Sequence, residues 1–138
     1  MSSTATVLDT TAAPSARSLL RGGAVATVLA AAATAAVATA GAAAGISLAV
    51  SGAPIPPAGF ATLTVVFSVL GLAIALLLRR FAGSPRTAWV RTTVALTLLS
   101  LVPDVLADAD TSTKVLLMVT HLVAAAIVIP AVGRRLHA

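Results

Sequence analysis

Four apolar stretches separated by short polar segments account for most of the chain. They cover about residues 24–50, 58–78, 88–107 and 115–132. A helix needs about 20 residues to cross a hydrocarbon core about 30 Å thick, and each stretch is close to that length or longer. We therefore predict an all-α transmembrane bundle of four helices, paired as two hairpins, with the lipid bilayer as its main partner.

Breaks in this pattern set the expected boundaries. Residues 1–18 are rich in Ser, Thr and Ala and lack a sustained apolar period, so we expect a disordered cytoplasmic tail there. The transmembrane domain is then expected over residues 19–138. The uncharged run over residues 22–78 is too long for one span and is interrupted at Ser51–Pro57, where glycine and prolines predict a turn.

The first stretch is rich in alanine and follows basic residues, so a secretory signal peptide is the competing interpretation. Its length of about 27 residues exceeds the usual 7–15 apolar residues of a signal peptide, which favours a retained span. Small residues let helix backbones approach closely, and Gly41 and Gly45 have the GxxxG spacing. We expect both glycines to pack against a neighbouring helix inside the bundle, in preference to forming a dedicated dimer seam.

Basic residues gather beside three of the polar segments. Because such residues in short loops stay cytoplasmic, both termini and the middle loop are expected inside the plasma membrane, with residues 51–58 and 108–114 outside. Trp89 is expected in the aromatic belt at the membrane surface, and Arg91 is expected to reach the lipid headgroups. The predicted topology anchors are Arg79, Arg80, Arg86, Trp89, Arg91, Arg134 and Arg135.

One face of the third stretch is polar. Five residues recur there at spacings of three and four, which places them along one side of a helix. They are Thr93, Thr97, Ser100, Asp104 and Asp108. If the third and fourth stretches form an antiparallel hairpin turning near residue 110, His121 lies level with Ser100 and one turn from Asp104.

These positions define a candidate intramembrane polar patch of Thr97, Ser100, Asp104 and His121. An ionisable side chain inside a span is by default a functional hypothesis. Here a structural hydrogen bond between helices is favoured over a proton relay or a ligand site, because Asp104 lies near the expected outer end of its helix and a neutral imidazole is inexpensive to bury.

The amino-acid composition argues against several kinds of functional site. The chain is 59% hydrophobic and 9% charged, with a mean hydropathy of +1.06, whereas a soluble domain has roughly 25% charged residues. The net charge is +5, but the basic residues flank apolar stretches, so nucleic acid is not an expected partner. Without cysteine or glutamate, we expect no metal site, no cofactor, no catalytic residue and no enzyme activity.

Two segments resemble a family of small actinobacterial membrane proteins of unknown function. The first is the basic loop with Phe81, Ser84-Pro85-Arg86 and Trp89, and the second runs from His121 to Pro130 and on to Arg134-Arg135-Leu136. The resemblance covers about residues 19–136. It implies four transmembrane helices and supplies no activity, cofactor or catalytic residue.

Two functions remain open at this point. The first is a non-enzymatic integral membrane protein that is structural or acts through a membrane partner, either a second copy or another membrane protein. The second is a small oligomeric transporter or channel whose pathway is lined by the polar face of the third stretch. That face should meet a hydrated cavity in a transporter and a packed helix otherwise.

The expected topology is testable by labelling intact cells with a membrane-impermeant thiol reagent. Ser112→Cys should be labelled and Ser84→Cys should not, because the distribution of basic residues places residue 112 outside and residue 84 inside. The unsubstituted chain contains no cysteine and is the control. Labelling of Ser84→Cys alone would invert the topology.

Overall fold

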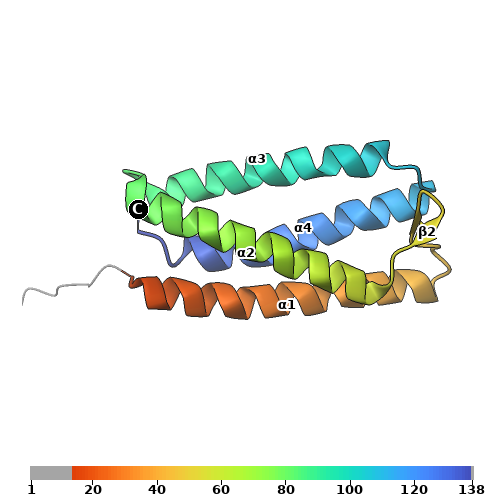
Figure 1. The fold of residues 1–138 in the computed structure, drawn as a ribbon, viewed down its shortest axis with the longest axis horizontal. Helices are drawn as coiled ribbons and strands as arrows, with labels where there is room; N and C mark the ends of the chain where they lie inside the picture. Colours follow the sequence, from red (N-terminus) through yellow and green to blue (C-terminus); the bar gives the residue numbers. More distant parts are fainter. Residues whose placement is uncertain (1–13, 138) are drawn as a thin grey trace, which may run out of the picture.

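The computed structural model describes residues 14–137, which form four long helices and one short hairpin (Figure 1). The helices are α1 (Ala16–Ala43), α2 (Pro57–Phe81), α3 (Pro85–Leu106) and α4 (Thr111–Gly133), and the strands are β1 (Ala49–Val50) and β2 (Ala53–Pro54). All four helices are long and apolar enough to cross a membrane. The prediction of an all-α transmembrane bundle is therefore confirmed, while the cytoplasmic placement of the termini stays a prediction.

Consecutive helices run antiparallel and lie side by side (Figure 1). Helix α1 packs mainly against α2 and α4, and α3 packs against α4 and, less extensively, α2. The start of α1, the α2–α3 connection and the chain's C-terminal segment gather at one end, which we call the basic end because it carries the predicted arginine anchors. The hairpin and the α3–α4 connection form the opposite end.

Helix α1 is the most enclosed of the four helices. Its apolar window is 39% buried, against 11–17% for the other three. The buried positions are mostly small: Gly23, Ala26, Thr27, Ala30, Ala31, Thr34, Ala38 and Gly41, together with Leu19. With so little side-chain volume, the backbone of α1 approaches both neighbours closely, which maximises dispersion contacts where no water drives the helices together.

The expected boundaries of the first helix are wrong at both ends. Helix α1 begins at Ala16, where the Ser15 hydroxyl accepts a hydrogen bond from the Ser18 amide at 3.1 Å, so the tail expected to reach residue 18 ends earlier. The rest of that expected tail, residues 1–13, lies outside the described residues. At the other end the helix stops at Ala43, not residue 50.

Gly45 terminates α1 and does not pack against another helix. Its φ is +88°, and no atom lies within 4 Å of the position of an added Cβ. The Gly45 amide donates to the Ala42 carbonyl and the Ile46 amide to the Gly41 carbonyl, both at 3.0 Å, which is the pattern of a Schellman cap. The prediction of Gly45 at a helix interface is therefore wrong, because this glycine supplies a left-handed backbone.

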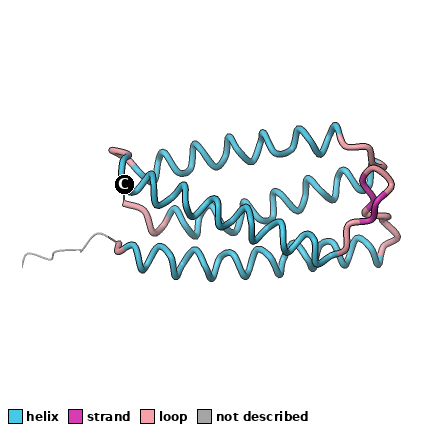
Figure 2. Tube along the Cα trace, in the orientation of Figure 1, coloured by secondary structure: helices cyan, strands magenta, loops and turns pink. Residues whose placement is uncertain are grey.

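A two-stranded hairpin follows, where only a turn was expected (Figure 2). Ser51 and Gly52 connect the strands and both have positive φ, 51° and 77°, as the favoured two-residue hairpin turn requires. The Ser51 amide donates to the Asp108 carbonyl at 2.7 Å. This bond joins the two connections at this end of the bundle.

Two apolar clusters close the ends of the bundle. At the hairpin end, Leu48 from the loop packs with Ala38, Phe60 and Leu116. At the basic end, Leu19 packs with Ala75, Trp89, Val132 and Leu136. Between them the contacts are made by small and hydroxyl-bearing residues, including a 2.9 Å hydrogen bond between the Thr34 and Thr64 hydroxyls that joins α1 to α2.

Trp89 belongs to the basic-end cluster, so its predicted place in a surface aromatic belt is wrong. The residue is only 1% exposed, and its indole N–H donates to the Ile129 carbonyl at 3.0 Å. A methyl group added at Gly71 or Gly133 would lie 3.5 Å from the ring. That distance is an ordinary van der Waals contact, so the indole packs against α2 and α4 and is held inside by this packing and by its satisfied donor.

Leucine at Gly41 should destabilise the bundle. The Gly41 Cα faces the Leu116 side chain on α4, and an added Cβ would overlap the Leu116 methyl. We expect Gly41→Leu to lower the free energy of unfolding in detergent by about 1–3 kcal/mol. Ala42→Leu is the control because Ala42 is exposed on the same turn. Equal stability of the two variants would show that the α1–α4 contact is not tightly packed.

Candidate functional site

Asp104 and His121 are brought together by an offset between α3 and α4. Asp104 lies two residues before the end of α3, roughly 3 Å along the axis, and His121 lies ten residues into α4, roughly 15 Å. Ala107 and Asp110, at either end of the connection, have extended ψ angles of 143° and 161°. The connection bends at residues 107–109 and becomes extended at Asp110, and α4 starts beyond the end of α3, so His121 meets Asp104 and not the level of Ser100.

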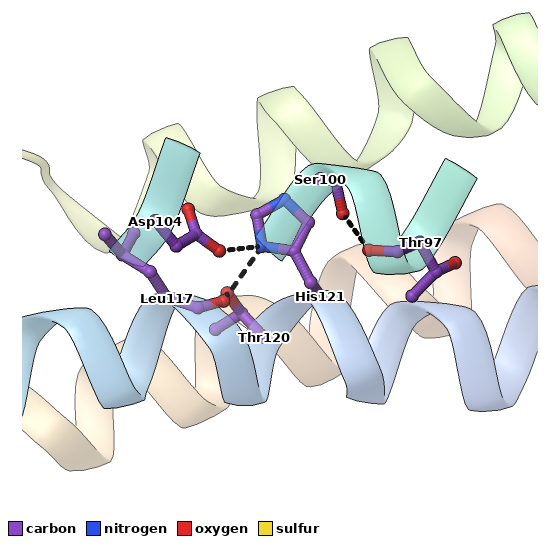
Figure 3. A network of polar contacts seen from close by, with 6 residues as sticks. All are labelled: Thr97, Ser100, Asp104, Leu117, Thr120 and His121. Carbon is purple, nitrogen blue, oxygen red and sulfur yellow. Dashed lines mark hydrogen bonds and ion pairs between the residues drawn. The ribbon is translucent and has the colours of Figure 1, made fainter. Parts of the chain in front are cut away.

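The His121 ring nitrogen Nδ1 is the centre of this site (Figure 3). It lies 2.8 Å from Asp104 Oδ2 and 3.0 Å from the Leu117 carbonyl oxygen one turn earlier. The Leu117 carbonyl also accepts a hydrogen bond from the Thr120 hydroxyl at 2.7 Å. Asp104 Oδ2 is buried and has no aligned hydrogen bond, so its contact with the ring is close but poorly directed.

This geometry assigns the tautomer of a neutral His121. Nδ1 lies between two oxygen acceptors, and only a protonated nitrogen is stable there. Nε2 of the neutral ring is then an acceptor. Within residues 14–137 it forms no hydrogen bond, and the side chain is 36% exposed, compared with 10% for Asp104. The pair therefore combines a buried carboxylate oxygen with a partly exposed imidazole.

Thr97 and Ser100 belong to the predicted patch but form no hydrogen bond with His121. The Ser100 hydroxyl donates to the Thr97 carbonyl at 2.7 Å, and the Thr97 hydroxyl donates to the Thr93 carbonyl at 2.8 Å. Thr93 likewise donates to the Trp89 carbonyl at 2.7 Å. These hydroxyls form their hydrogen bonds within their own helix. Within residues 14–137, Asp104 is therefore the one residue of the polar face of α3 whose side chain forms a polar interaction with α4 (Figure 3).

Asp110 has a structural role that sequence reasoning missed. Its carboxylate accepts hydrogen bonds from the Thr113 amide and the Ser112 hydroxyl at 2.7 Å, and from the Ser47 hydroxyl at 2.9 Å. These bonds, led by the one from the Thr113 amide, hold the pKa of Asp110 well below its ordinary value of 3.8. The sequence feature that could have predicted this role is an aspartate directly before a helix, which is typical of an N-cap residue.

Two hollows in the bundle lie away from the polar face of α3. An apolar groove of about 510 Å³ lies between α1 and the start of α4, and its lining includes Val37 and Val119. A smaller hollow of about 220 Å³ lies between α3 and α4 at the basic end. Neither is lined by the stripe from Thr93 to Asp108. Within residues 14–137 no three histidine or carboxylate side chains come together to hold a metal ion.

The Asp104–His121 contact should be measurable as a coupling energy. His121→Ala should lower the free energy of unfolding by about 0.5–2 kcal/mol, the usual range for a hydrogen bond within a membrane protein. In a double-mutant cycle with Asp104→Ala the losses should be less than additive, because either change removes the same contact. Asp108→Ala is the control, since Asp108 is exposed beyond the helix end. Additive losses for Asp104 and His121 would contradict the contact.

Comparison with known protein families gives a match over most of the chain. A family of unknown function, DUF6069, matches residues 14–138, which is most of the chain. The comparisons with curated proteins and with solved structures found no match. The expected membership of a membrane-protein family of unknown function is thus supported by both the match and the four apolar helices, and the chain belongs to the DUF6069 family.

Proposed function

We propose that this protein is a non-enzymatic, multi-pass protein of the plasma membrane that acts by associating with a second copy of itself through the α3–α4 face. The observation that carries the proposal is the partly exposed His121 imidazole, whose Nε2 forms no hydrogen bond within residues 14–137. This nitrogen lies roughly 15 Å along α4, at a depth where lipid offers no hydrogen-bond donor. A donor from another membrane-embedded helix would satisfy it.

The surroundings of His121 support a helical partner. An exposed apolar side chain adjoins the site on α3, because Val105 directly follows Asp104 and is 53% exposed. Helix packing in membranes combines such dispersion contacts with isolated polar hydrogen bonds. Most oligomers are built from identical chains in closed symmetry, so a second copy is the partner to which the proposal commits.

A non-enzymatic role is supported by the way the polar groups of the bundle are used. The hydroxyls of Thr93, Thr97 and Ser100 are hydrogen-bonded to their own helix. Asp110 caps α4 and binds the hairpin loop through Ser47. These groups hold the fold together and are not directed at a common point where a substrate would react.

Energy transfer between labelled copies in lipid vesicles tests the proposed association. The natural chain should show transfer that rises with the protein-to-lipid ratio, and His121→Phe should reduce it because phenylalanine keeps the ring but lacks the acceptor. Leu29→Ala is the control, since Leu29 is exposed on α1, which packs on α2 and α4 and lies away from the α3–α4 face. Transfer that is absent in the natural chain, or unchanged in His121→Phe, would contradict association through this face.

The alternative is a small oligomeric transporter or channel. It is favoured by one observation, the buried carboxylate oxygen of Asp104 2.8 Å from a titratable ring nitrogen, which is an arrangement able to bind and release a proton. The same vesicles with an entrapped pH dye distinguish the two functions. The proposal expects equal proton permeability for the natural chain and His121→Asn. Flux that His121→Asn abolishes without unfolding the protein would establish the alternative.

A further inference from the structure

A hollow at the basic end has the chemistry of a phospholipid site. It has a volume of about 220 Å³ and lies between the first turns of α3 and the last turn of α4. Its lining is ordered by depth, with Arg86 and Arg134 at the helix ends and Val90, Ile129 and Pro130 farther along the spans. Cations at the rim and apolar walls below them match an amphiphile standing in the membrane.

The two arginines are available for an anionic ligand. Both are exposed, and within residues 14–137 neither forms a salt bridge. The acids in this part of the chain, Asp104, Asp108 and Asp110, all lie toward the opposite end of the bundle. A guanidinium offers several N–H donors in a planar fork that suits a phosphate group, and two of them at one rim can share its oxygens.

The floor of the hollow is held rigidly by the basic-end cluster. Gly133 lines the hollow, and a methyl group added there would lie 3.5 Å from the indole of Trp89. The chain after α4 is tied down nearby, because the Arg86 amide donates to the His137 carbonyl at 3.2 Å and the Arg135 guanidinium donates to the Ser18 hydroxyl at 3.0 Å. The backbone around the hollow is therefore positioned by contacts of the fold itself.

We infer that this hollow binds the phosphodiester headgroup of an anionic glycerophospholipid, with its phosphate between Arg86 and Arg134 and its first methylene groups against Val90, Ile129 and Pro130. The helix ends place the two arginines at headgroup depth in a bilayer, where basic recesses between helices collect anionic lipid. Apolar walls beneath the cations favour a lipid over a free phosphate ion, which has no apolar part to bury.

Native mass spectrometry of the full chain in mild detergent tests this site. The probe is an equal mixture of phosphatidylglycerol and phosphatidylcholine with matched acyl chains. The natural protein should retain phosphatidylglycerol preferentially. Arg86→Gln/Arg134→Gln should weaken that binding about 30-fold, which corresponds to about 2 kcal/mol for the loss of two cations at the membrane surface. Thermal unfolding in the same detergent checks that each variant is folded.

Two further variants separate the hollow from general surface charge. Arg17→Gln/Arg21→Gln removes the same charge from exposed positions on α1 at the same end, outside the hollow, and should leave the lipid preference unchanged. Val90→Phe should narrow the hollow without changing charge and should also weaken binding. An equal loss in the α1 control, or unchanged binding in both Arg86→Gln/Arg134→Gln and Val90→Phe, would overturn the inference.

A soluble competitor distinguishes a lipid headgroup from a free phosphate ester as the ligand of the hollow. Glycerol 3-phosphate at millimolar concentration should not displace phosphatidylglycerol, because it makes no contact with the apolar walls. Complete displacement would show that the hollow recognises a free phosphate ester and would overturn the lipid assignment.

Discussion

The close approach of α1 to α2 and α4 is the constraint on which the rest of the bundle depends. A bilayer provides no hydrophobic force between helices, so dispersion contacts and a few hydrogen bonds must hold them together. Alanine, glycine and threonine on α1 bring the backbones near enough for those contacts, as at Gly23 against Leu72 and Gly41 against Leu116. Larger residues then fill only the two ends, where the apolar clusters form.

Helix α3 packs against the bundle near its two ends more closely than at its middle, and both candidate sites lie near those ends. It has buried residues near its first turns, including Trp89 and Thr93, and again at Asp104 near its end, while Thr97 and Ser100 between them are half-buried. Trp89 fixes the basic end, and the Asp104–His121 contact fixes the other. The proposed association face and the proposed lipid hollow both lie along this α3–α4 seam, near its two points of attachment.

Charge divides the bundle along the same axis. Arginines gather at the basic end, whereas the described acids lie toward the hairpin end, where Asp110 is fully engaged in capping α4 and holding Ser47. The depressed pKa of Asp110 means that its carboxylate stabilises the folded state at pH values above 3.8 and that this contribution is lost only as the pH falls below that value. The Asp110 hydrogen bonds that join the two connections at the hairpin end therefore persist throughout the neutral pH range.

The sequence by itself determined the class of the molecule, the number of helices and the approximate bounds of the last three, because hydrophobic length and helix-breaking residues act locally. It also placed Asp104 and His121 on facing sides of neighbouring helices. Tertiary structure decided what depends on register and on available space. The α3–α4 connection selected Asp104 over Ser100 as the partner of His121, and the basic-end cluster with the Ile129 carbonyl placed Trp89 inside. Both outcomes depend on the relative placement of whole helices, which no local pattern of residues encodes. The Schellman cap at Gly45 is instead a local feature, typical of a glycine that follows a helix.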